Sequence, residues 1–183
     1  MSDKLPRVTA ILRIMEDAYG DVPSDALQRA ADRGTALHGI CCQHLAAMMD
    51  LCQLPTIENP DYERHYAGFL EWVTKRSITP YLVEQLSVNE EEGYIGTPDA
   101  LVQYGTGELV VVDMKFTASI IRLNRVQIQA YHKLAGYTRA QKLILLHINP
   151  TSGEWEEIEV KPNPRDWCAF KCAISINQWR IAA

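Results

Sequence analysis

The run at residues 109–115 constrains the fold more than any other stretch of this chain. Four consecutive apolar residues, 109–112, are followed by Asp113, Met114 and Lys115. A continuous β-branched run predicts a strand that is buried on both faces. Residues two apart in a strand point to the same face, so Asp113 and Lys115 project together. Buried charges are costly to desolvate unless they pair or bind a metal, so the run predicts an ion pair or a metal site at a strand end.

The remaining hydrophobic periodicity predicts an alternation of helices and strands around this run. Helices are expected at 7–19, 25–52, 61–76, 122–138 and 163–181, and strands at 79–88, 94–104, 109–116, 143–148 and 155–160. The first three strands have short links and predict an antiparallel meander, and the strand after the helix must rejoin the sheet by a crossover. We therefore expect a single α/β domain, 1–183, with a mixed central sheet flanked by helices.

Composition and charge limit the classes of function. The chain is 47% hydrophobic and 22% charged, which is ordinary for a soluble globular protein. No run reaches the length of a membrane span and the N-terminus lacks a secretory pattern, so we expect a cytoplasmic protein. A net charge of −5 argues against a protein that coats nucleic acid, but it is compatible with a metal site that has a local basic rim. The candidates for such a rim are Lys75, Arg76, Lys115, Arg122, Arg125, Lys133, Arg139 and Lys142.

Five cysteines are present, at an odd number and irregular spacing that do not suit a disulfide framework. They are Cys41, Cys42, Cys52, Cys168 and Cys172. No pair has the C-x-x-C spacing, and buried free cysteine is the commoner outcome. We expect no iron–sulfur cluster.

A second acidic residue, Asp99, follows Pro98 on the strand before Asp113. Asp99 and Asp113 together would form a hard oxygen site for Mg²⁺ or Mn²⁺. Lys115 would then orient or help deprotonate a metal-bound water and offset phosphate charge. Glu84, on the preceding strand, is either a third acidic residue of this site or a glutamate on the solvent face. The alternative for Asp113 and Lys115 is an ordinary ion pair.

Other candidate residues lie on the predicted helices. His38 follows Gly34 in an apolar helix and is either a core histidine or a metal ligand. Gln127 and Tyr131 are four apart and share one helix face, where they could bond phosphate or the catalytic groups. The alternative is that Tyr131 packs in the core and Gln127 faces water. Arg122 and Arg125, near the start of the same helix, could meet phosphates with help from the helix dipole.

Together these residues resemble the motifs of the PD-(D/E)XK nuclease superfamily, and most closely its RecB-type and phage (lambda exonuclease-like) exonuclease branch. The matching segments, over about residues 30 to 150, are Pro98-Asp99 for PD, Asp113-Met114-Lys115 for D-x-K, Gln127 to Tyr131 for Q-x-x-x-Y, Gly34 to His38 for G-x-x-x-H, and Glu84 for the upstream glutamate. The chain lacks the C-terminal cysteine group of branch members that carry an iron–sulfur cluster.

The resemblance implies a restriction-endonuclease-like α-β-β-β-α-β core with additional N-terminal helices. It implies a Mg²⁺-dependent deoxyribonuclease, expected to be an exonuclease of recombination or repair, with DNA as its substrate and a single-strand annealing protein as a candidate partner. His38, Asp99, Asp113 and the Met114 carbonyl would ligate the metal, and Lys115 would be the catalytic lysine. The alternatives are an endonuclease of restriction or junction-resolving type, or a non-catalytic DNA-binding module on the same fold.

Overall fold

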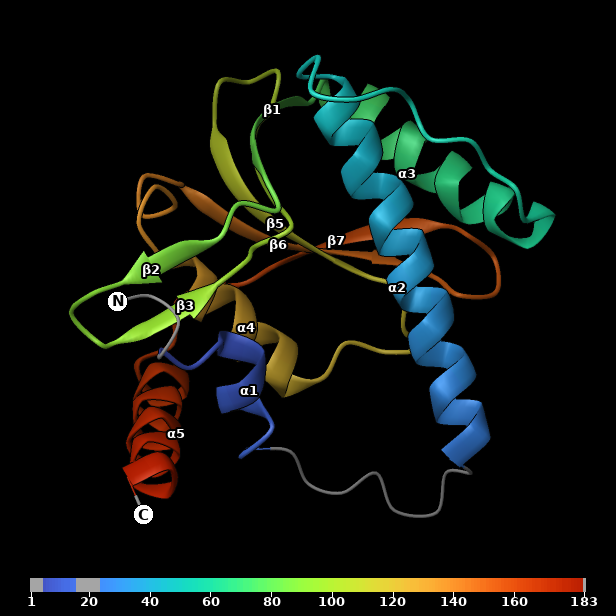
Figure 1. Cartoon of the computed structure of the whole chain (residues 1–183). Coiled ribbons are helices and arrows are strands. Elements are labelled where there is room, and N and C mark those ends of the chain that lie inside the picture. The colour runs from blue at the N-terminus through green and yellow to red at the C-terminus, as the bar shows by residue number, and fades with distance from the viewer. Residues whose placement is uncertain (1–4, 16–23, 183) are drawn as a thin grey trace.

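The computed structural model describes residues 5–15 and 24–182 of the chain (Figure 1). Its helices are α1 (Val8–Leu12), α2 (Ser24–Ala47), the short 3₁₀ helix η2 (Pro60–Tyr62), α3 (Glu63–Arg76), α4 (Arg122–His132) and α5 (Pro164–Ala182). Its strands are β1 (Thr79–Val83), β2 (Ser87–Asn89), β3 (Tyr94–Gly96), β4 (Ala100–Gln103), β5 (Leu109–Lys115), β6 (Lys142–Ile148) and β7 (Trp155–Glu159).

Five of these strands form one mixed sheet in the order β1-β4-β5-β6-β7. The first three strands of this order pair antiparallel, as a meander should. After α4 the chain returns as β6, which pairs parallel to β5, and β7 then pairs antiparallel to β6. The predicted mixed α/β fold and its α-β-β-β-α-β core are confirmed by this order of elements.

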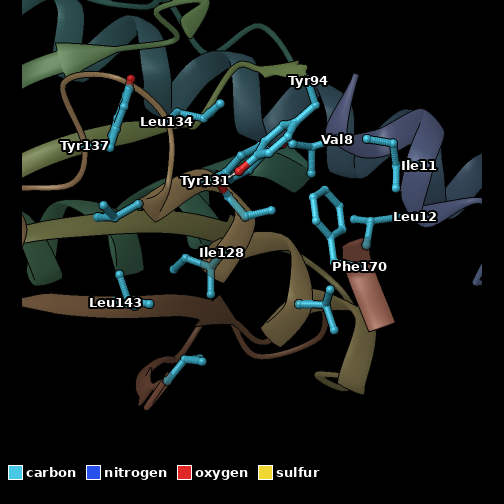
Figure 2. Close-up of a cluster of buried hydrophobic side chains, with 14 of the residues drawn as sticks. Val8, Ile11, Leu12, Tyr94, Ile128, Tyr131, Leu134, Tyr137, Leu143 and Phe170 are labelled. Atoms are coloured by element: carbon cyan, nitrogen blue, oxygen red, sulfur yellow. Dashed lines mark hydrogen bonds between the residues drawn. The ribbon is translucent and has the colours of Figure 1, made fainter. Parts of the chain in front are cut away.

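Helices cover both faces of the sheet, and β5 supplies side chains to each. Val111 packs with α1, α4 and α5, in a cluster to which Tyr131 and Phe170 also belong (Figure 2). Val110 and Val112 pack on the opposite face, with α2 and α3. All three valines are completely buried, which explains the continuous apolar run that the sequence shows at this strand.

Two predicted strands are shorter than expected, because the chain leaves the five-stranded sheet after β1 and returns to it at β4. The expected strand 79–88 ends as β1 at Val83, where Glu84 takes a left-handed φ of 45° that cannot continue an extended strand. The expected strand 94–104 is split into β3 and β4 around Pro98, which has no N–H to donate to a ladder. The inner halves, β2 and β3, pair with each other as a separate two-stranded ribbon.

Three helices end earlier than expected. Helix α4 ends at His132 rather than 138, and the chain continues in turns in which Gly136 has a φ of 84°. Helix α2 ends at Ala47 rather than 52. Helix α1 ends at Leu12, residues 13–15 of the expected helix form turns, and residues 16–19 lie outside the described residues. Of the helices described, none is both long and apolar enough to cross a bilayer.

Helix α3 approaches the β6–β7 turn so closely that Gly68 has no room for a side chain. A Cβ atom at Gly68 would lie 2.0 Å from the carbonyl oxygen of Gly153, in the turn. We expect Gly68→Ala to lower the free energy of unfolding by about 2 kcal/mol, because helix and turn must move apart. Gly39→Ala is the matched control, since a Cβ there meets nothing within 4 Å and should stabilise α2 by up to about 1 kcal/mol. Urea unfolding of the two variants checks this, and equal effects would contradict it.

Candidate active site

The Asp99 carboxylate joins the central strand to helix α2. Asp99 directly precedes β4 and is buried. Its Oδ2 accepts the Met114 backbone N–H at 2.6 Å, and its Oδ1 lies 2.8 Å from His38 Nε2. Because Ala100 pairs with Val112, this geometry places Asp99 across from Asp113 at the end of β5. The break at Pro98 that shortens the predicted strand thus frees a carboxylate to reach both β5 and α2.

Asp113 and Lys115 form a buried ion pair on the α4 face of β5. Asp113 Oδ2 lies 2.7 Å from Lys115 Nζ, and the Asp113 side chain is 1% exposed. Oδ2 therefore has the Lys115 ammonium group as its partner, although the angle of this contact departs from that of a well-aligned hydrogen bond. Two carboxylates, those of Asp99 and Asp113, thus lie buried at this end of the sheet beside the Lys115 ammonium group.

Burial and charge act in opposite directions on this pair. Burial raises the pKa of Asp113 to about 6, with Lys115 opposing the shift and the nearby Asp99 adding to it. Burial lowers the pKa of Lys115, but the charges of Asp113 and Asp99 outweigh burial, so its pKa is raised overall. Lys115 is accordingly held as an ammonium group.

Helix α4 completes a chain of polar contacts from the ion pair. Lys115 Nζ donates to Gln127 Oε1 at 2.9 Å, and Gln127 Nε2 donates to the Tyr131 hydroxyl at 3.0 Å. Tyr131 also packs in the hydrophobic cluster of Figure 2, so its ring is anchored while its hydroxyl meets Gln127. Gln127 and Tyr131 therefore share a helix face, and this face is turned toward Lys115.

His38 and Glu84 meet on the other side of Asp99. The Nδ1 atom of His38 lies 3.8 Å from Glu84 Oε1. Glu84 is one residue beyond β1, and its backbone N–H donates to the Asp99 carbonyl at 3.0 Å. Burial lowers the pKa of His38, but Asp99, Glu84 and Asp113 outweigh burial and raise it overall. The structure thus brings His38, Glu84, Asp99, Asp113 and Lys115 together.

Cys42 is a neighbour of this group that the sequence reasoning missed. Its Sγ lies 3.7 Å from His38 Nε2 and 3.9 Å from His38 Nδ1. The signal that could have found it is the spacing of four residues between His38 and Cys42, which places both on one face of α2.

The expected basic residues are more scattered. Arg122 donates through Nε and Nη2 to Asp166 Oδ1 of α5, at 2.9 and 2.6 Å, so it fastens α4 to α5. Arg125 is exposed on α4. Lys142 pairs with Glu108 at the start of β6, which is the opposite end of the sheet from Asp113.

The donor atoms fit a hard divalent cation. The carboxylates of Asp99 and Asp113, with the imidazole of His38, offer the oxygen and nitrogen ligands that Mg²⁺ or Mn²⁺ accepts. The burial of these two neighbouring carboxylates, which raises the pKa of Asp113, is the observation that favours a cation there. Met114, the fourth expected ligand, lies between Asp113 and Lys115, with its N–H held by Asp99.

A groove of about 800 Å³ opens beside these residues. One wall is helix α2, from Ala30 to His38, and the other is the segment that follows β5, from Met114 to Ile121. Both His38 and Lys115 line it, and so does Arg33, whose Nε has no hydrogen-bond partner among the residues described. The candidate site is therefore accessible from a groove with a positive group in its wall.

Comparisons with solved structures give the class of fold. The alkaline exonuclease LHK-Exo from Laribacter hongkongensis matches with a TM-score of 0.54 and 12% identity, over 96% of this chain and 87% of that chain. LHK-Exo in complex with dAMP matches with a TM-score of 0.51 and 12% identity, over 97% of this chain and 88% of that chain. A phage related exonuclease from Haemophilus somnus 129PT matches with a TM-score of 0.50 and 12% identity, over 95% and 92% of the two chains.

The chain thus has the fold of phage-like alkaline exonucleases over nearly its whole length, and the resemblance expected from the sequence is confirmed at the level of the fold. No protein-family model and no curated protein matches the chain.

The raised pKa of Asp113 predicts a pH-dependent cost in the metal-free protein. Between the ordinary value of 3.8 and about 6, the unfolded state loses this proton while the folded state keeps it. The free energy of unfolding of the parent should therefore fall with rising pH across this window, relative to Asp113→Asn, and the difference should level off above it. Urea unfolding of both proteins in EDTA measures this, and parallel pH curves would contradict it.

The contact between Gln127 and Tyr131 predicts different effects for two buried tyrosines. Tyr131→Phe removes the acceptor of the Gln127 amide and should cost about 1 kcal/mol of stability. Tyr137→Phe is the matched control, because the buried Tyr137 hydroxyl has no hydrogen-bond partner within the described part of the chain. Its loss should be neutral or stabilising. Thermal or urea unfolding compares the two, and an equal loss of stability would remove the assigned role of the Gln127 contact.

Proposed function

We propose that this protein is a Mg²⁺-dependent deoxyribonuclease, and specifically an exonuclease that hydrolyses DNA phosphodiester bonds in recombination or repair. The observation that carries the proposal is the buried group of Asp99, Asp113 and Lys115 beside a groove that His38 and Lys115 line. The likeness of fold to alkaline exonucleases supports it.

In this proposal Asp99, Asp113, His38 and the Met114 carbonyl hold the metal ion. When bound, Mg²⁺ would lower the pKa of a coordinated water and offset charge on the phosphoryl oxygens. The carboxylate of Asp99 already has its place fixed by the Met114 N–H, so little reorganisation is needed on binding.

Lys115 acts as a positioned ammonium group. Its raised pKa keeps it protonated, so it donates to a phosphoryl oxygen or to the attacking water rather than accepting a proton at neutral pH. Gln127 accepts one of its hydrogens, and Tyr131 in turn anchors Gln127. Gln127, Tyr131 and the ion pair with Asp113 thus hold Lys115 in place, which would leave one N–H of the ammonium group for the substrate.

The groove is the proposed path of the DNA strand. Arg33 supplies a guanidinium group from α2 in a wall of the groove. Guanidinium groups bind phosphate through several donors at once. The structure of LHK-Exo in complex with dAMP supports a nucleotide substrate for the shared fold. The exposed Arg125 is a further candidate for a phosphate contact, whereas the contact of Arg122 with Asp166 favours a structural role.

The single domain, the cytoplasmic location and a single-strand annealing partner stay predictions. An endonuclease or a DNA-binding module on the same fold would share the groove. Whether the protein cuts linear DNA only, closed circular DNA as well, or neither distinguishes the three functions.

The test is cleavage of end-labelled linear duplex DNA and of a covalently closed circle, with Mg²⁺ or with EDTA. We expect loss of the linear DNA alone, and only with Mg²⁺. Asp113→Asn and Lys115→Ala should each lower the rate at least about 10³-fold, because each removes charge from the reacting centre. Lys142→Ala is the matched lysine control and should cut at the parental rate, since its ion pair with Glu108 lies at the opposite end of the sheet.

Cutting of the circle would replace the exonuclease with an endonuclease. Binding of DNA without cutting would favour the non-catalytic module. Parental activity in Lys115→Ala would show that the proposed site is not the one that cuts.

A further inference from the structure

A second pocket, of about 400 Å³, adjoins the groove beside the candidate active site. The groove and this pocket share two lining residues, Arg33 of α2 and Pro150, which follows β6. The remaining walls of the pocket come from η2, the start of α3 and the β6–β7 turn, which meet beside α2 (Figure 1). The pocket therefore continues the groove on the side away from the sheet end where Asp113 lies.

Three arginines converge on this second pocket. Arg29 and Arg33 are four residues apart and share one face of α2, and Arg64 comes from the first turn of α3 in the facing wall. Asp61 is the only acidic residue in the lining. In a chain with a net charge of −5, the pocket is thus a local excess of positive charge next to the groove.

The guanidinium groups in the pocket have donors to spare for an anion. Arg76 and Arg122 each pair with a carboxylate, but none of the three pocket arginines does so among the side chains that the structure describes. Arg33 Nε is buried and has no hydrogen-bond partner in the described part of the chain. A buried donor without a partner costs free energy, so an acceptor that enters the pocket is favoured. Arg64 uses Nη1 to donate to the Thr151 carbonyl at 3.0 Å, which leaves its other nitrogens for a ligand.

Contacts within the protein fix the walls of the pocket. His65 is buried, and its ring nitrogens lie 3.1 Å from the Asp61 carbonyl oxygen and 3.0 Å from the Pro150 carbonyl oxygen. The turn also presses on α3, since a Cβ atom at Gly153 would lie 2.6 Å from the Arg64 carbonyl oxygen. The start of α3 is therefore fastened to the β6–β7 turn, and the pocket needs little reorganisation to bind a ligand.

We propose that Arg29, Arg33 and Arg64 bind backbone phosphates of the substrate DNA strand, beyond the phosphodiester bond at the candidate active site. This assignment rests on the proposed nuclease function and extends the path of the strand. A guanidinium group matches phosphate through several donors at once. Because phosphate contacts carry no sequence information, the pocket would raise the affinity for DNA of any sequence.

The length of α2 sets how far this pocket lies from the reacting centre. Arg33 and Arg29 are five and nine residues from His38, which corresponds to about 7.5 and 13.5 Å of helix. One strand of stacked DNA advances about 3.4 Å per nucleotide. The pocket would therefore hold phosphates about two to four nucleotides from the bond that is cut.

The first test measures DNA binding without cleavage, in EDTA, by the fluorescence anisotropy of a labelled single-stranded oligonucleotide of mixed sequence. Arg29→Ala and Arg64→Ala should each lower the affinity about 5-fold and reduce the slope of log affinity against log salt concentration by about 0.7, because one phosphate contact is lost. Arg29→Lys should keep the slope, since it keeps the charge. Parental affinity and slope in both alanine variants would overturn the proposal.

Arg180→Ala is the matched control for Arg29→Ala. Both arginines are exposed on helices, but Arg180 lies in the last turn of α5, and α5 packs on the opposite face of the sheet from α2. Arg180→Ala should therefore keep the parental affinity and slope. Equal losses in Arg180→Ala and Arg29→Ala would overturn the pocket, because the overall charge of the protein would then explain both.

Cleavage with Mg²⁺ separates the pocket from the reacting centre. Arg29→Ala should raise KM for linear DNA about 5-fold and leave kcat within about 2-fold, because a remote contact binds substrate and transition state equally. A fall in kcat at the parental KM would overturn the binding role.

The two measurements together distinguish the pocket from the nuclease function. If no protein cuts DNA but Arg29→Ala and Arg64→Ala still lower the affinity and the slope, the nuclease is rejected and the phosphate site stands. If the parent cuts DNA and both variants bind and cut as the parent does, the phosphate site is rejected and the nuclease stands. Absence of DNA binding by the parent would reject both.

Discussion

The burial of two carboxylates at the end of β5 is the constraint on which the arrangement around the site depends. Asp99 is stabilised by the Met114 N–H and by His38, so it fixes β5 and α2 to each other. Asp113 is paired with Lys115, and its pKa is raised because burial and the charge of Asp99 outweigh the attraction of Lys115 and His38. A buried charge whose desolvation is not fully compensated destabilises the folded chain. The same charge makes this position favourable for a cation.

The sheet divides the site between two layers of helices. Along β5, Met114 faces α2 whereas Asp113 and Lys115 face α4, because alternate residues of a strand point to opposite sides. Helix α2 brings His38 to the site, and α4 brings Gln127. The two hydrophobic clusters hold these helices at fixed positions on β5, so packing far from the charges sets the geometry among them.

His38 connects helix α2 to two acidic residues that come from different strands. Its Nε2 lies 2.8 Å from Asp99 Oδ1, just before β4, and its Nδ1 lies 3.8 Å from Glu84 Oε1, just after β1. These carboxylates raise the pKa of His38 although its burial opposes the shift.

The sequence by itself determined the features that depend on local periodicity. The buried run of β5, the shared face of Asp113 and Lys115 and the shared face of Gln127 and Tyr131 follow from the repeats of strands and helices, and so does the order of the main helices and strands. Tertiary structure decided the contacts between distant segments. The pairing of Arg122 with Asp166, 44 residues later, could not be inferred from either position.

The same holds for the break between β3 and β4, which sends Asp99 to β5 and α2, and for Glu84 beside His38 and Cys42. Pro98 and the spacing of His38 and Cys42 were visible in the chain, but the partners that give them meaning come from other elements. Local spacing fixes which side chains share a face. Only the packing of the layers fixes what that face meets, because the energy of a buried charge depends on every group around it.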